Sequence, residues 1–158
     1  MKIMIVALII CVSLGCACGL LKENKISNEQ IDADIGNQAL KVTEGSPNVW
    51  DFKKDNGRCF NISESKYAEG KAEVTVRLAS FYDANFDVKF EDLPEEKHIV
   101  ETALGEIVLN YKSEGDKWVF EKAESKKLLA KSISNNDFRN TFLPLQFKLC
   151  ENYEHKDK

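Results

Sequence analysis

The stretch KAEVTVRLASFYD at residues 71–83 is the clearest strand in the chain, because apolar and polar side chains alternate along it. Successive side chains of a strand point to opposite faces of its sheet. The apolar face of this stretch consists of Ala72, Val74, Val76, Leu78 and Tyr82, and the other face is charged or polar. We therefore expect a strand of an antiparallel sheet that is buried on one side only.

A first hairpin is predicted from residues 49–54 and 58–63, which both alternate with a period of two. Asn56 and Gly57 lie between these segments. An Asn-Gly pair flanked by alternating apolar residues is a strong indication of a two-residue hairpin turn. We therefore expect Asn56 and Gly57 to form the turn.

A second hairpin is predicted from residues 104–112 and 117–124, which are joined by the short polar segment SEGD. Trp118 and Phe120 can meet Tyr111 across this hairpin. Cross-strand pairs of aromatic and aliphatic side chains stabilise a sheet, so this hairpin should be a well-packed part of the core.

Three further segments complete the expected topology. Residues 86–90 repeat the alternation and predict another strand, and residues 128–140 predict a short helix or turn. Residues 142–150, FLPLQFKLC, place leucine and phenylalanine at alternate positions and predict a last strand. Pro144 lacks a backbone donor, so this strand should lie at a sheet edge or begin after the proline.

One helix is predicted over residues 28–40. Ser27 and Gln30 stand at the spacing of a capping box, with a negative charge in the first turn. The apolar stripe of this segment consists of Ile31, Ile35 and Leu40. One helix and about six or seven strands predict an α+β fold, with a short N-terminal helix packed on a curved antiparallel sheet. The alternative is an all-β barrel or sandwich with a stray helix.

The chain begins with a positive charge and about a dozen apolar residues, which is typical of a secretory signal peptide. This run is shorter than the roughly 20 residues that a membrane-spanning helix needs. We expect residues 1–17 to be a signal peptide and residues 18–26 to be a tether. Cys16 after Gly15 resembles the end of a bacterial lipobox, which makes Cys16 the expected lipidation site and anchors the protein to a membrane. The alternative is ordinary cleavage after Ala17.

Residues 27–150 are enough for one α+β domain with its own core, and residues 151–158 are expected to form a polar tail. Cys59 and Cys150 are the two cysteines in this part of the chain. An exported protein meets an oxidising environment, so we expect a disulfide between them. Such a bond would close a long loop and restrict the unfolded chain.

The charge of the chain argues against nucleic acid as a partner. The net charge is −4, and the few arginines are dispersed rather than clustered as phosphate binding requires. A Cys16 and Cys18 pair supplies only two of the four ligands of a structural zinc site. We therefore expect no metal ion and no cofactor, and we expect His98 to lie at the surface.

Residues 104–112 and 117–124 also resemble the hairpin of small exported bacterial proteins with cystatin-like or nuclear-transport-factor-like sheets. The resemblance implies that, in an enzyme of the second class, an aspartate base and tyrosine or aspartate oxyanion donors lie in a cone-shaped cavity. The nearest residues by type are Tyr82, Tyr111 and Asp83. We expect both tyrosines to fill the core instead, so no catalytic residue is assigned.

These observations predict an exported, lipid-anchored, non-enzymatic module that binds an unknown protein or small-molecule ligand. No Gly-x-Ser-x-Gly motif or other catalytic pattern is present in the sequence. One alternative is a small-ligand carrier or enzyme with an apolar pocket between helix and sheet, lined by Tyr82, Tyr111 and Trp118. Another is a secreted enzyme inhibitor, which suits a small domain with a disulfide.

Overall fold

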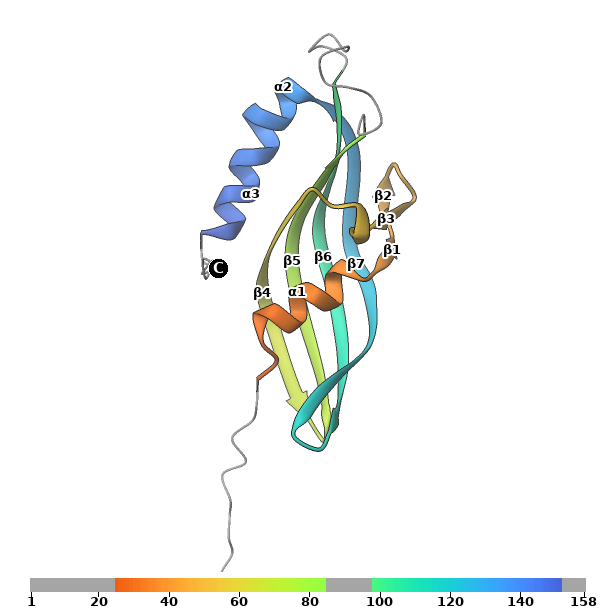
Figure 1. Cartoon of the computed structure of the whole chain (residues 1–158), viewed down its shortest axis with the longest axis vertical. Helices are drawn as coiled ribbons and strands as arrows, with labels where there is room; N and C mark the ends of the chain where they lie inside the picture. Colours follow the sequence, from red (N-terminus) through yellow and green to blue (C-terminus); the bar gives the residue numbers. More distant parts are fainter. Residues whose placement is uncertain (1–24, 85–97, 152–158) are drawn as a thin grey trace, which may run out of the picture.

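Figure 1 shows a computed structural model of the chain, which describes residues 25–84 and 98–151. The predicted signal peptide, the lipidation site at Cys16, most of the tether, the strand predicted at 86–90 and nearly all of the tail lie outside the described residues. The described part has the predicted α+β fold, in which helices pack on a mostly antiparallel sheet.

Four long strands form most of the main sheet. They are β4 (Gly57–Ala68), β5 (Lys71–Asp83), β6 (Ile99–Glu114) and β7 (Lys117–Ser134), and neighbouring members pair antiparallel. The short strand β2 (Glu44–Gly45) pairs with β7 in parallel, which gives the order β2-β7-β6-β5-β4. The strand predicted at 71–83 is confirmed as β5, and Figure 1 shows the sheet as long and twisted.

The second predicted hairpin is confirmed by β6 and β7. Tyr111 pairs with Phe120 in the register, and their ring centroids lie 5.7 Å apart. The segment predicted as a helix or turn, 128–140, begins instead as a continuation of β7. Leu128 and Ala130 are buried against the core. Their burial stabilises this segment as a strand that stays paired with β6.

The first predicted hairpin is wrong. Strand β3 (Val49–Asp51) pairs antiparallel with β1 (Ala39–Lys41), and a 3-10 turn, η1 (Phe52–Lys54), follows β3. Asn56 leads into β4 and donates its backbone N–H to the Phe81 carbonyl at 2.9 Å. The segments on either side of Asn56 and Gly57 pair with β1 and β5 rather than with each other, so tertiary pairing overrides the local turn preference.

Helix α1 (Asn28–Gly36) begins where the sequence predicts but ends earlier. The Ser27 hydroxyl accepts a hydrogen bond from the Gln30 backbone N–H at 3.1 Å and caps the helix. The predicted extension to residue 40 is wrong because Ala39–Lys41 pairs with β3. Leu40 is therefore buried from a strand rather than from the helix.

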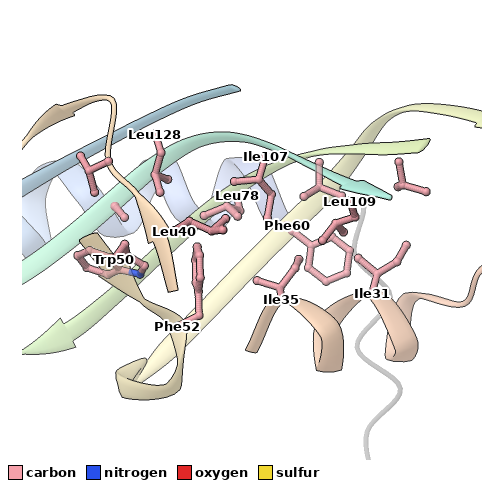
Figure 2. Close-up of a cluster of buried hydrophobic side chains, with 14 of the residues drawn as sticks. Ile31, Ile35, Leu40, Trp50, Phe52, Phe60, Leu78, Ile107, Leu109 and Leu128 are labelled. Atoms are coloured by element: carbon pink, nitrogen blue, oxygen red, sulfur yellow. The ribbon is translucent and has the colours of Figure 1, made fainter. Parts of the chain in front are cut away.

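Figure 2 shows the core between α1 and one face of the main sheet, which we call the front face. Ile31 and Ile35 of α1 lie over Phe60, while Trp50 and Phe52 lie farther along the same face. The sheet side of this core includes Phe60, Leu78, Ile107, Leu109 and Leu128. Two short elements, α1 and the β1–β3 ribbon, thus close the front face over apolar side chains.

The segment predicted as a last strand, 142–150, is helical instead. Helix α2 (Asn135–Asp137), a π-helical turn, η4 (Phe138–Phe142), and α3 (Leu143–Cys150) follow one another, and we call residues 135–150 the C-terminal helix. Its most buried residues, Phe138, Phe142 and Gln146, recur every four positions, which is the spacing of one helix face. Pro144 lies in the first turn of α3, just after the π-helical turn, where its missing donor is tolerated.

The C-terminal helix packs on the opposite face of the sheet, which we call the back face. Phe138 and Phe142 lie 4.7 and 6.4 Å from Phe81 of β5, measured between ring centroids. Ala79 and Val100 are buried in the same small cluster. The back face therefore has its own core, smaller than the one on the front face.

The predicted disulfide is present and joins Cys59 of β4 to Cys150 at the end of the C-terminal helix, with the Cα atoms 5.9 Å apart. The bond spans 91 residues and holds the helix on the β4 side of the back face. Such a bond is consistent with an oxidising compartment outside the cytoplasm.

His98 is buried, with 5 % of its surface exposed, so the expected surface position is wrong. Its carbonyl accepts a hydrogen bond from the Asn135 backbone N–H at 3.0 Å. The start of the C-terminal helix therefore lies against the start of β6.

Candidate functional site

The back face contains an apolar groove between the sheet and one flank of the C-terminal helix, which we call the helix groove. Its volume is about 410 Å³. The floor is formed by Thr102 and Leu104 of β6 and by Leu129, Lys131 and Ile133 of β7; the wall is formed by Asp137, Thr141, Phe142 and Leu145. The groove is thus built by three consecutive elements of the chain, β6, β7 and the C-terminal helix.

The register of β6 and β7 brings the floor residues together. Thr102 lies opposite Lys131, and Leu104 lies opposite Leu129. Side chains alternate across a strand, so every second residue of each strand reaches the back face. Ala103, between the two floor positions of β6, is accordingly buried in the front core.

The helix groove is open because the C-terminal helix is fastened to the other half of the back face. Its aromatic contacts are with Phe81 of β5, and its disulfide is with Cys59 of β4. The floor on β6 and β7 is left partly uncovered. Leu104 of the floor is 36 % exposed and Leu145 of the wall is 48 % exposed, so large apolar side chains meet water here.

Two charged residues line the helix groove. The Asp137 carboxylate accepts a hydrogen bond from the Ser134 hydroxyl at 2.9 Å, and Ser134 caps the start of the helix in return. Lys131 is exposed, and within the described part of the chain it forms no ion pair. The groove therefore combines an apolar floor with a positive charge that has no carboxylate partner there.

The three residues predicted to line a front pocket are not brought together. Tyr82 of β5 pairs with Glu101 of β6, and Glu101 is ten residues before Tyr111. Ten residues of extended strand correspond to about 33 Å. Tyr82 packs on Trp50 with ring centroids 5.0 Å apart. Trp118 lies at the Tyr111 end of the sheet and packs on Tyr67 at 5.5 Å.

Tyr111 lies beneath α1 with 1 % of its surface exposed. Burial raises the pKa of its hydroxyl well above the ordinary value, and the negative charge of Asp34 on α1 adds to this shift. Burial also raises the pKa of Asp34, while Tyr111 and Gln30 offset part of that shift. The raised pKa keeps the Tyr111 hydroxyl protonated at neutral pH.

A buried polar chain lies beside η1, and the sequence analysis missed it. Trp50 Nε1 donates to Ser80 Oγ at 3.1 Å, and Ser80 Oγ donates to Asp55 Oδ1 at 2.5 Å. Arg58 bridges Asp55 at 2.7 Å and Asp32 at 2.9 Å. Burial raises the pKa of Asp55, and Ser80 and Arg58 offset part of this shift. These hydrogen bonds and ion pairs link α1 and η1 to the sheet. The Arg58 guanidinium lies between the carboxylates of Asp55 and Asp32.

Sequence reasoning also missed the helix groove. The helix that forms the wall of this groove was not predicted, because segment 142–150 was interpreted as a strand. The four-residue spacing of Phe138, Phe142 and Gln146 could have indicated a helix, but the alternation of leucine and phenylalanine from Leu143 to Leu149 favoured a strand, despite Pro144.

Over residues 25–84 and 98–151, no group of three or more His, Cys, Asp or Glu side chains is placed to hold a metal ion. In the same residues no helix has both the length and the apolar character needed to cross a membrane.

Comparison with known proteins finds no matching family, no matching curated protein and no matching solved structure.

Proposed function

We propose that this protein is a non-enzymatic binding module whose ligand lies in the helix groove. The observation that carries this proposal is the partly uncovered apolar floor at Leu104 and Leu129. Small-molecule sites typically measure about 300–1,000 Å³ and combine an apolar lining with a few polar groups. The helix groove, at about 410 Å³, has that size and that composition. Binding an apolar ligand would remove this floor from water, which is favourable.

The proposal includes a location outside the cytoplasm, with a lipid on Cys16 holding the protein at a membrane. The Cys59–Cys150 disulfide supports an oxidising compartment. A diacyl anchor would give stable attachment, because two chains bind a bilayer far more firmly than one. The intact mass of the protein from its native host tests this part. A chain that starts at Cys16 and carries acyl groups supports the anchor, and a lipid-free chain that starts after Ala17 contradicts it.

A neutral apolar dye such as Nile red tests the binding site itself. We expect the folded monomer to bind one dye molecule, and Leu104→Ser to weaken binding about tenfold. Ile62→Ser is the matched control, because Ile62 is also 36 % exposed but lies on β4, outside the groove lining. Absence of dye binding, or equal loss in both variants, would contradict a site in the helix groove.

A further inference from the structure

We infer that the helix groove binds a single-chain amphiphile with an anionic head group, whose alkyl chain lies on the apolar floor and whose head group meets Lys131. This inference rests on the proposed function and specifies its ligand class. Three features of the groove lead to it: its size, the state of the backbone around it, and its charge.

The size of the helix groove favours a narrow ligand. From Leu129 to Ile133 the floor extends about 13 Å along β7, and from Asp137 to Leu145 the wall extends about 12 Å along the helix. A partner helix, about 10 Å across, would enter a groove of about 410 Å³ with one face only. An extended alkyl chain is long and thin enough to fit.

The backbone around the helix groove offers little to a peptide ligand. The floor strands β6 and β7 are paired with each other along the whole groove, and the wall is a helix whose backbone groups bond internally. A peptide lying on the floor would therefore bury its own N–H and carbonyl groups without partners, which is costly; only a peptide added at the outer edge of β7 beyond Ala130, where β2 ends, would find them. An alkyl chain has no such groups and pays no such cost.

The charge of the helix groove favours an anionic head group. Lys131 is the cation of the lining, and it forms no ion pair with the residues that the structure describes. The acidic lining residue, Asp137, already accepts a hydrogen bond from Ser134. Thr102 donates its hydroxyl to the Lys131 carbonyl at 3.0 Å, which fixes the backbone from which the ammonium group extends. The carboxylate head group of a ligand, placed at the rim of the helix groove, would thus be able to form an ion pair with Lys131.

The test compares two amphiphiles of equal chain length and opposite charge, decanoate and decyltrimethylammonium, below their micelle-forming concentrations. Calorimetry would use the chain from Ala17 to Lys158, which lacks the apolar run of the predicted signal peptide and Cys16 but keeps every described residue, so that no detergent is needed to keep it in solution. We expect decanoate to bind one molecule per chain and at least tenfold more tightly than decyltrimethylammonium. Octanoate should bind more weakly than decanoate by up to about fifteenfold, because each methylene contributes up to about fourfold.

Variants of two lysines on β7 locate the head group. Lys131→Gln should remove the preference for decanoate, and Lys117→Gln, at the far end of the same strand, should keep it. Equal binding of the two amphiphiles, or no effect of Lys131→Gln, would overturn the anionic head group. If decanoate does not bind while Nile red still binds at Leu104, the ligand class is wrong and the proposed function stands. If neither binds, both fail.

Discussion

The two faces of the main sheet are covered in different ways. On the front face, α1 and the β1–β3 ribbon close over side chains such as Trp50 and Ile107, which are fully buried. On the back face, the C-terminal helix covers β4 and β5 around Cys59 and Phe81 but leaves Leu104 in contact with water, and Leu145 of the helix itself also meets water. The front face is therefore a closed core, and the partly open back face contains the groove for which we propose a ligand.

The largest expected effect of a single substitution is at Trp50 on the front face. Trp50→Ala would leave a large cavity and remove the donor to Ser80, so we expect a loss of about 3–5 kcal/mol in the free energy of unfolding. Urea denaturation measures this loss. Val49→Ala, at an exposed neighbouring position, should change stability by no more than about 0.5 kcal/mol. Equal effects of the two variants would break the assignment of the front face as the stabilising core.

The next largest effect is expected from removing the disulfide on the back face. The double variant Cys59→Ala with Cys150→Ala should lose about 2–4 kcal/mol, because the unfolded chain is no longer restricted. Hydrogen exchange should then show lower protection in the C-terminal helix before α1 or the centre of β6 is affected. A loss of protection spread evenly over both faces would contradict the independence of the two cores.

A smaller effect is expected at Asp34, whose carboxyl group lies near Tyr111 beneath α1. Its pKa is raised in the folded state, so folding favours the protonated form. This contribution is fully present below the unfolded-state pKa, about 3.9, and is lost as pH rises through the higher folded-state pKa. Asp34→Asn should therefore flatten the decline of stability with pH above about pH 4. Urea midpoints measured between pH 3 and pH 7 test this. Glu44→Gln, at an exposed position, is the control. If the urea midpoints of Asp34→Asn and the wild type change with pH in parallel, the expectation is contradicted.

The smallest effect on stability is expected at the floor of the helix groove. Leu104→Ala should cost no more than about 0.5–1 kcal/mol, because Leu104 is partly exposed already. Ile107→Ala on the same strand should cost about 2–4 kcal/mol, because Ile107 is fully buried on the front face. Thermal unfolding of the two variants sharpens the comparison within one strand. A similar loss at both positions would show that the back face is also a closed core.

The sequence predicted the long strands because their pattern is set by burial on one side. β5 and the hairpin of β6 and β7 follow the alternation of apolar and polar residues, and the α1 N-terminus follows its cap at Ser27. The Cys59–Cys150 bond was also predicted, from the number of cysteines and the expected compartment. These features depend on local chemistry or on a simple count.

The remaining features depend on contacts between distant segments. Asn56 and Gly57 were predicted to form a hairpin turn. The segment before them, β3, pairs with β1, and the segment after them, β4, pairs with β5. Local turn preference does not indicate these partners. Residues 142–150 alternate like a strand, but they continue a helix whose buried face, at Phe138 and Phe142, packs against Phe81. The helix groove requires both the register of β6 and β7 and the position of that helix, so sequence reasoning alone could not assemble it.

The most direct test of the central claim is a titration of the ¹⁵N-labelled protein with decanoate, followed by backbone amide chemical shifts. The account predicts saturable shifts at Leu104, Leu129, Lys131 and Leu145, with the amides of Ile35 and Trp50 on the front face unchanged. Saturable shifts confined to the front face, or none in either place, would contradict the helix groove as the binding site.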